Sequence, residues 1–138
     1  MSHPGKLPAS ALSHVSLGTN DYPRAKAFYD AVLATLQIPC VMDFPGGAGY
    51  GRAFPEFWIQ QPHDGGRASA GNGAHVCFLA NSIEEVKAFH AKAIELGGQD
   101  DGAPGLRPEY TERYYAAFVR DPEGNKLEAM LMLEPQSR

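Results

Sequence analysis

The spacing of apolar residues predicts two amphipathic helices. In the first, apolar side chains recur at helical intervals over 25–36, and Pro23 stands where a first helical turn tolerates proline. The second helix is expected to begin at Ser82, whose Ser-Ile-Glu-Glu pattern is typical of a capping box, and to end at Gly97 and Gly98. Each helix follows a short apolar segment that begins with histidine, so the pattern predicts a strand, a turn and a helix, twice.

Further apolar-rich segments predict strands after each helix. They are Cys40–Phe44, a segment near Tyr50–Phe54, Phe57–Gln61, Tyr114–Arg120 and Lys126–Leu133. Between the last two, Asp121–Asn125 contains Pro and Gly in the order that favours a tight hairpin turn. The stretch Gly102–Tyr115 is rich in Gly, Pro, Tyr and Arg, and we interpret it as a loop. Either it offers binding residues, or Pro104 and Pro108 stiffen a surface connection whose Tyr rings pack in the core or a dimer interface.

The chain repeats itself at an offset of 61 positions. His14-Val15 falls on His75-Val76, and Lys26-Ala27-Phe28 falls on Lys87-Ala88-Phe89. The fold class expected is therefore α+β: paired βαβββ modules, produced by internal duplication, that form a curled mixed sheet around a central site. We expect one domain over 1–138, with halves of about 12–64 and 73–132 joined by the glycine-rich run 65–73.

Composition narrows the classes of protein. The net charge is −4, and neither predicted helix has a row of basic residues along its surface, which argues against nucleic-acid and anionic-membrane partners. No apolar run reaches the roughly 18 residues of a membrane span. The two cysteines, Cys40 and Cys77, are too few for a disulfide framework, and we expect a reduced, cytoplasmic setting.

Alternation of side chains along the strands predicts which residues share a face. If Val15, Val76 and Leu127 pack under the helices, the opposite face collects four polar side chains. These are His14, Gln60, His75 and Glu128. Two imidazoles and a carboxylate suit one divalent transition metal ion (Fe, Mn, Ni, Co or Zn) and leave open positions for substrate. Gln60 is the weakest candidate ligand, since an amide oxygen is neutral and seldom binds such ions.

The same residues carry a family resemblance. His14-Val15-Ser16-Leu17, the helix containing Ala27-Phe28-Tyr29, His75-Val76 and the segment 118–128 resemble the vicinal oxygen chelate superfamily. This superfamily includes glyoxalase I, extradiol dioxygenases, fosfomycin-resistance enzymes and bleomycin-binding proteins. The resemblance covers roughly residues 12–132 and is closest to uncharacterised glyoxalase-like proteins.

The resemblance implies metal ligands at His14, His75 and Glu128. Gln60 falls where glyoxalase I enzymes generally have a glutamate, and an amide cannot take up a proton at neutral pH. The set of two histidines and one glutamate is more similar to extradiol dioxygenases and fosfomycin-modifying enzymes. Glu128 is the candidate catalytic residue. Candidate substrate contacts are Trp58, Arg107, Tyr110, Tyr114 and Met130.

Two hypotheses of different classes follow. The first is a metal-dependent glyoxalase-like enzyme, of lyase, isomerase or dioxygenase type, in which the metal is a Lewis acid for a small vicinal-oxygen or carbonyl substrate. The alternative is a metal-free protein that sequesters a small molecule or drug, as bleomycin-resistance proteins do. Family resemblance implies a homodimer, with the site formed within one chain or shared between chains. A third possibility is that the fold is retained without a catalytic role.

Overall fold

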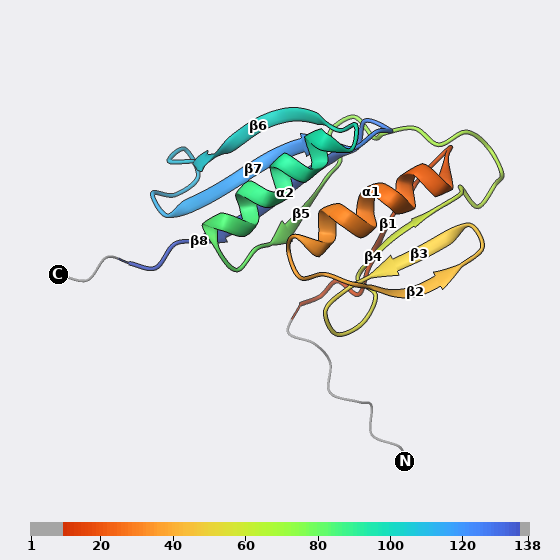
Figure 1. Cartoon of the computed structure of the whole chain (residues 1–138), viewed down its shortest axis with the longest axis horizontal. Coiled ribbons are helices and arrows are strands. Elements are labelled where there is room, and N and C mark those ends of the chain that lie inside the picture. The colour runs from red at the N-terminus through yellow and green to blue at the C-terminus, as the bar shows by residue number, and fades with distance from the viewer. Residues whose placement is uncertain (1–9, 136–138) are drawn as a thin grey trace, which may run out of the picture.

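The computed structural model describes residues 10–135, in which two modules have the same βαβββ order (Figure 1). The first module contains β1 (Val15–Gly18), α1 (Tyr22–Ala34), β2 (Cys40–Phe44), β3 (Gly47–Tyr50) and β4 (Phe57–Gln60). The second contains β5 (His75–Leu79), α2 (Ile83–Glu95), β6 (Gln99–Leu106), β7 (Tyr114–Arg120) and β8 (Lys126–Met132). The predicted α+β fold of paired βαβββ modules is confirmed.

Each module has its own mixed sheet. The strand orders are β1-β4-β3-β2 and β5-β8-β7-β6, with β1–β4 and β5–β8 parallel and the other pairs antiparallel. Among the described residues no hydrogen-bonded ladder joins the sheets, so they stay separate rather than forming one closed curl. β1 and β5 are edge strands on the sides of the sheets nearest the middle of the molecule (Figure 1).

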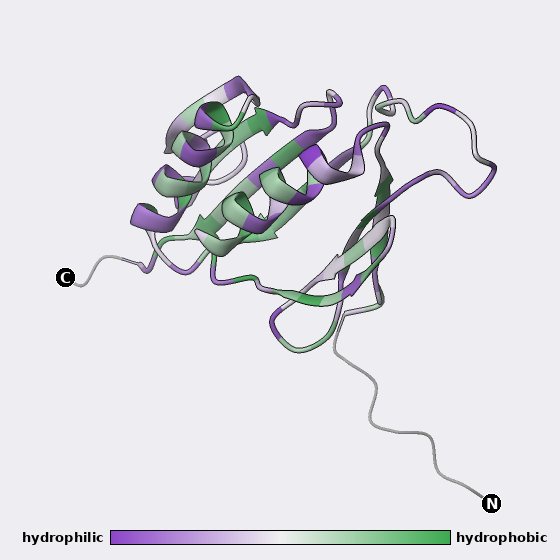
Figure 2. Ribbon diagram, turned by 45° about the vertical axis from the view of Figure 1, so that its right-hand side comes forward, coloured by the Kyte–Doolittle hydropathy of each residue, from purple (hydrophilic) through white to green (hydrophobic). Residues whose placement is uncertain are grey.

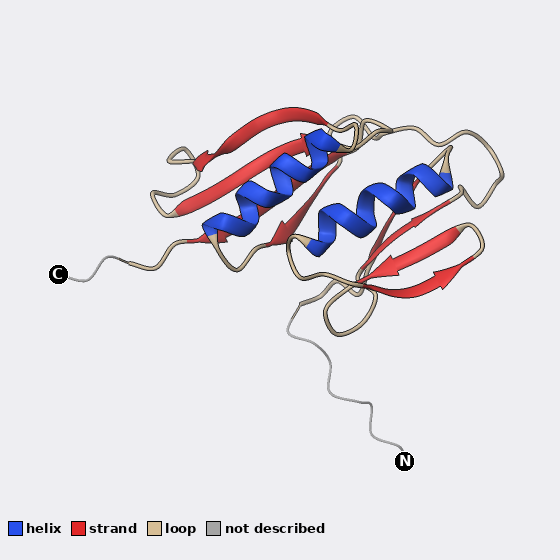
Figure 3. Cartoon of the chain, viewed as in Figure 1, coloured by secondary structure: helices blue, strands red, loops and turns tan. Residues whose placement is uncertain are grey.

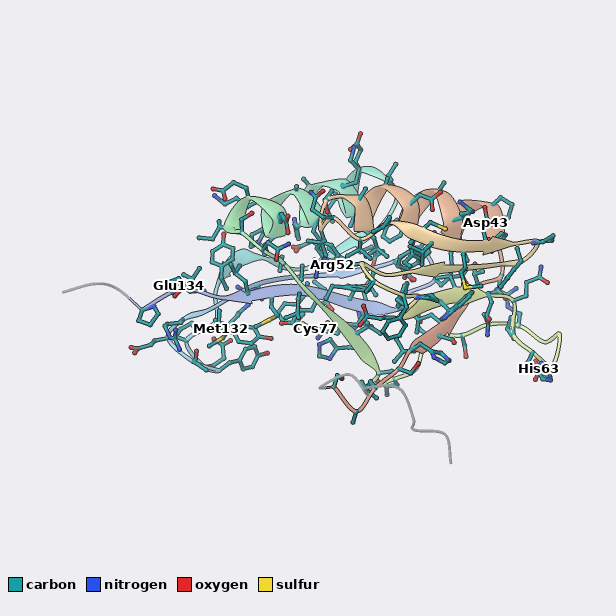
Figure 4. The ribbon with its side chains drawn as sticks, turned by 90° about the horizontal axis from the view of Figure 1, so that it is seen from below. Asp43, Arg52, His63, Cys77, Met132 and Glu134 are labelled. Atoms are coloured by element: carbon teal, nitrogen blue, oxygen red, sulfur yellow. The ribbon has the colours of Figure 1, made fainter. Side chains whose placement is uncertain are left out.

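Both helices cover the same side of the sheets and leave the other side open (Figures 3 and 4). Asp21 caps α1 by accepting a hydrogen bond from the Arg24 backbone N–H at 3.1 Å. At the start of α2, the Ser82 hydroxyl accepts from the Glu85 N–H at 3.1 Å, as its capping pattern predicts. Polar and apolar residues alternate along both helices (Figure 2), because only one side of each contacts a sheet. In the part of the chain that the structure describes, neither helix is long and apolar enough to span a membrane.

One apolar core connects the two modules. Tyr29 of α1 packs on Phe57 of β4 with ring centroids 5.0 Å apart, and Phe57 meets Phe78 of β5 edge-on at 5.1 Å. Val15, Val76 and the fully buried Leu127 lie on this side of the sheets, as strand alternation predicts. The open face therefore carries the side chains of the opposite parity.

The Asp121–Asn125 hairpin turn also ties the modules together. Its Gly124 N–H donates to the Asp121 carbonyl at 2.9 Å, which confirms the predicted turn. The buried Asp121 carboxylate accepts a hydrogen bond from Tyr29 of the first module. Glu123 accepts hydrogen bonds from the Thr19 hydroxyl and from the Asn20 backbone N–H. These contacts fix how the two halves sit against each other.

Two expectations about local structure are wrong. The strand expected near Tyr50–Phe54 is instead β3 (Gly47–Tyr50), whose glycines resemble a turn because glycine has low strand propensity. The segment interpreted as a loop from Gly102 contains most of β6, which pairs with β7. β6 is an edge strand with irregular register, and such strands tolerate proline and glycine. Pro104 and Gly105 have low strand propensity, which is why the sequence pattern did not predict this strand.

Candidate functional site

Glu128 occupies the centre of the open face of the second sheet. It lies opposite Cys77 of β5 and Phe118 of β7 in the strand register. Although only 3% of Glu128 is exposed, both of its oxygens have partners. Oε1 lies 2.8 Å from the Nε2 atom of His75, and Oε2 accepts a hydrogen bond from the Tyr114 hydroxyl at 2.5 Å. The structure thus brings together two predicted ligands, His75 and Glu128, and one predicted substrate contact, Tyr114.

The environment of Glu128 keeps neighbouring groups protonated. Burial, followed by the hydrogen bond to Glu128, raises the pKa of Tyr114 above its ordinary value. Burial and then the charge of Glu128 raise the pKa of the Cys77 thiol to about 12. Near neutral pH, the Tyr114 hydroxyl consequently stays protonated and donates a hydrogen bond to Glu128, and Cys77 is a thiol rather than a nucleophilic thiolate.

His14 lies at the start of the first module, immediately before β1. Its Nδ1 atom is 2.9 Å from the Ser13 hydroxyl oxygen, and its side chain is exposed. His14 and His75 line a common cavity of about 320 Å³ at the junction of the modules, with Arg52 and Glu56 also in its wall. Across residues 10–135, no three His, Cys, Asp or Glu side chains converge closely enough to hold a metal ion. In this chain His14 therefore stands apart from the His75–Glu128 pair.

The register of the sheets shows which first-module residue corresponds to Glu128. In the second module Cys77 pairs with Glu128, and the repeat offset makes Ser16 the counterpart of Cys77. Ser16 pairs with Trp58. Gln60 pairs with Gly18, two positions further along, which corresponds to Met130 in the second module. The position equivalent to Glu128 is thus filled by an indole, not by the amide of Gln60.

Trp58 lies flat on the open face of the first sheet. Its ring stacks on Phe44 with centroids 5.7 Å apart and planes 11° from parallel. Gly49 on the neighbouring β3 allows this approach, because a Cβ atom there would come within 2.9 Å of the indole. Gln60 is exposed at the end of β4. The first module therefore presents an apolar surface where the second presents a carboxylate.

The other predicted substrate contacts lie on the second sheet or its loop. Tyr110 is 56% exposed and packs edge-on against Tyr114, with centroids 5.0 Å apart. Met130 is half-buried and lines a cavity of about 660 Å³ together with Leu79 and Met132. Arg107 lies over the Phe118 ring, with its Cζ atom 5.4 Å from the centroid. In Figure 4, Cys77 and Met132 mark this side of the strands, opposite the helices.

Phe118 lies next to His75 and Glu128 but was not among the site residues predicted from the sequence. Its ring centroid lies 6.2 Å from that of His75, and the Nζ atom of Lys126 lies 5.1 Å from it. The available signal was the hairpin turn Asp121–Asn125, because pairing Arg120 with Lys126 across it puts Phe118 opposite Glu128. Arg52 was also missed, and no sequence pattern indicates that it donates to the carbonyls of Leu36 and Leu79, one in each half.

Comparison with known proteins agrees with this architecture. Residues 11–129 match the family model described as Glyoxalase/Bleomycin resistance protein/Dioxygenase superfamily. The chain belongs to this superfamily. Among solved structures, a glyoxalase/bleomycin resistance protein from Albidiferax ferrireducens is 41% identical with a TM-score of 0.81, and the match covers 88% of this chain and 98% of that one. The family resemblance that the sequence motifs predicted is confirmed.

Two more distant superfamily structures share the fold. A family enzyme from Burkholderia phytofirmans is 20% identical with a TM-score of 0.68, covering 90% of this chain and 100% of that one. A lactoylglutathione lyase from Agrobacterium tumefaciens is 21% identical with a TM-score of 0.61, covering 91% of this chain and 95% of that one. No curated protein matches the sequence. For this superfamily member, the likeness to these two structures establishes the fold alone.

Proposed function

We propose that this chain is a metal-dependent glyoxalase-like enzyme of lyase, isomerase or dioxygenase type, acting on a small vicinal-oxygen or carbonyl substrate. The observation that carries the proposal is the His75–Glu128 pair, held at the centre of an open sheet face with Tyr114 on the second carboxylate oxygen. Membership of a superfamily that includes glyoxalases and dioxygenases supports it. The proposed metal ligands are His14, His75 and Glu128.

The donor set fits a divalent transition metal. Imidazole nitrogen and carboxylate oxygen bind such ions at about 2.0–2.2 Å, so two donors at right angles on one ion lie about 3 Å apart. The Nε2 atom of His75 and Oε1 of Glu128 are 2.8 Å apart. Imidazole and carboxylate donors suit Fe, Mn, Ni, Co or Zn. Gln60 is left out of the proposed set because its strand register places it beside Gly18.

The third ligand requires a second surface to close over the open face. Leu79, the last residue of the edge strand β5, is 64% exposed, and Met132 is 43% exposed, which is typical of a face that another surface covers. We propose a homodimer in which His14 of the partner subunit approaches the His75–Glu128 pair. Such a dimer needs no change within either module, because the contacts of Tyr29 and Glu123 already fix the two halves of each chain.

The side chains of this chain define the proton chemistry. The metal, when bound, supplies Lewis acidity that polarises a substrate oxygen. Oε2 of Glu128, to which the Tyr114 hydroxyl donates a hydrogen bond, is the atom at which this carboxylate would accept a proton from the substrate. Trp58 and Met130 supply apolar walls that limit the access of water to a bound substrate.

The alternative is a metal-free protein that sequesters a small molecule. The stacked pair of Trp58 and Phe44 favours it, since exposed aromatic faces bind flat or cationic ligands. A net charge of −4 also suits a cationic ligand. Under this alternative, ligand binding is unaffected by a metal chelator.

Metal content tests the proposal. We expect elemental mass spectrometry to find about one transition metal ion per site in protein purified without chelators, and His75→Ala to lose it while remaining folded. His90→Ala is the matched control, because His90 lies on α2 and is paired with Asp100 away from the site. If His75→Ala keeps the metal, or the wild-type chain binds none after reconstitution, the metal-dependent function is wrong and the sequestering alternative takes its place.

A further inference from the structure

Two cationic side chains on one aromatic ring lie next to the proposed metal ligands. The guanidinium carbon of Arg107 is 5.4 Å from the centroid of Phe118, and the Nζ atom of Lys126 is 5.1 Å from it. The same ring lies 6.2 Å from that of His75 and pairs with Glu128 in the strand register. Any molecule that reaches His75 and Glu128 from this side meets both cations.

Arg107 is held by backbone carbonyls of β6, the strand that ends immediately before it. Its Nη2 atom donates to the Ala103 carbonyl at 2.7 Å, and Nη1 donates to the Gly105 carbonyl at 2.9 Å. Between residues 10 and 135 no carboxylate lies within 4.0 Å of this guanidinium, although Arg107 is only partly exposed. Because the Arg107 side chain is already fixed and has no acidic partner, an anion that binds it does not have to compensate for lost side-chain entropy.

The charge balance around Phe118 is positive. Lys126 lies 3.8 Å from Asp101, but Arg120 already bonds the same carboxylate oxygen at 3.0 Å. Around this ring three cations, Arg107, Lys126 and Arg120, therefore face two carboxylates, that of Asp101 and that of Glu128, which pairs with Phe118 in the strand register; the net charge of the whole chain is −4. This concentration of positive charge on an acidic protein favours a negatively charged ligand.

Gly102 makes room for the cluster. Its φ of +154° belongs to a region that side chains rarely adopt, and a Cβ atom there would lie 2.9 Å from Phe118 and 3.0 Å from the guanidinium of Arg107. The irregular register of β6 at this residue therefore lets the ring and the cation pack together.

Beyond Glu128, on the other side from the cations, the open face becomes apolar. The register places Met130 and then Met132 along β8 after Glu128, with the exposed Leu79 opposite Met130 on β5. A ligand that spans the face therefore meets positive charge at one end and apolar side chains at the other.

We infer that Arg107 and Lys126 bind the anionic group of the substrate, so that the substrate is a small organic anion, such as a carboxylate, with an apolar portion. This inference rests on the proposed function, because the bound anion is a substrate only if the protein is an enzyme. The anion site itself needs no metal, so the two can be tested separately on the same protein.

The test uses benzoate as the probe and uncharged benzamide as its neutral counterpart. Both are titrated into the full-length, chelator-treated chain at low salt, followed by amide chemical shifts. We expect benzoate to bind more tightly than benzamide and to shift amides around Phe118. Lys126→Gln and Arg107→Gln are each expected to weaken benzoate about tenfold, which corresponds to about 1.4 kcal/mol, and to leave benzamide unchanged. Added salt should weaken benzoate binding in the wild type.

Arg67→Gln is the control, since it removes the same charge from the linker between the modules. Lys126→Gln keeps the test valid if Arg107→Gln disturbs the end of β6. The inference is overturned if benzamide binds as tightly as benzoate, or if Arg67→Gln weakens benzoate as much as the two site variants do. Metal titration of the same samples separates the two proposals. Benzoate binding without metal binding supports the anion site and refutes the metal-dependent enzyme. Metal binding without benzoate binding supports the metal-dependent enzyme and refutes the anion site.

Discussion

The hydrogen bond from Tyr29 to Asp121 predicts how strongly one hydroxyl couples the two modules. The Tyr29 ring is 1% exposed and Asp121 is 4% exposed. Besides the tyrosine hydroxyl, this carboxylate accepts hydrogen bonds from the backbone of Glu123 and from the backbone and side chain of Asn125, each at 2.9 Å. Burial, followed by the charge of Asp121, raises the pKa of Tyr29, so the hydroxyl is protonated and remains a hydrogen-bond donor near neutral pH. Tyr29→Phe removes that donor and leaves a buried carboxylate with one fewer partner.

The expected loss of stability follows from these contacts. A hydrogen bond to a charged group contributes about 1.5–3 kcal/mol, and no water replaces the hydroxyl easily at a site this buried. We therefore expect Tyr29→Phe to lower the free energy of unfolding by about 2 kcal/mol. For a domain of this length, that loss lowers the melting temperature by about 6–8 °C.

Urea unfolding measures the effect, and Tyr50→Phe is the matched control. The Tyr50 ring is also fully buried, and its hydroxyl donates to a carboxylate, Asp30, at 2.7 Å. Asp30, however, is 43% exposed and is already paired with Lys26, so its loss of one partner should reduce stability by less than about 1 kcal/mol. The reasoning is refuted if Tyr29→Phe changes stability by less than about 0.5 kcal/mol, or by no more than Tyr50→Phe does.

Two further predictions follow from Glu123 and Trp58. Burial acts to raise the pKa of Glu123, but hydrogen bonds from Asn20 and Thr19 and the charge of Arg24 outweigh it and hold that pKa below its usual value. Its contribution to stability is therefore present above about pH 4.5 and is lost as pH falls through the lowered pKa, so urea unfolding should show wild type and Glu123→Gln converging in acid. Trp58→Glu places a carboxylate at the first-module position that is equivalent to Glu128. Calorimetric titration with Zn²⁺ should then show tighter or additional binding, and unchanged binding would contradict the equivalence of the two positions.

The sequence predicted the larger features of the fold well because they depend on local periodicity. The two helices, the Ser82 cap, the Asp121–Asn125 turn and the strand over 114–120 each follow from short patterns that packing does not override. β3 and β6 escaped prediction for the opposite reason. Their glycines and proline have low strand propensity, and only pairing with a neighbouring strand makes them extended.

The candidate site was partly predictable. Alternation along β5 and β8 correctly places His75 and Glu128 on one face, since period two needs no knowledge of partners. The first-module counterpart of Glu128 could not be found from sequence spacing, because it depends on the register between parallel strands; the structure pairs Gln60 with Gly18 and Ser16 with Trp58. Tyr114 reaches Glu128 across a hairpin, and its role as a hydrogen-bond donor was likewise invisible before the strands were paired.

The two modules have the same fold but unequal chemistry. In the second, one strand pair holds an imidazole and a buried carboxylate at 2.8 Å, with a hydroxyl and two cations close by. In the first, His14 lies immediately before β1, Trp58 lies on β4, and Gly49 leaves room for the indole because it has no Cβ atom. A symmetric ancestor of repeated modules would have offered the same groups twice. The division here means that the second sheet supplies most of the polar groups that a ligand meets, whereas on the first sheet a substitution that keeps Trp58 apolar should mainly alter the shape of the wall.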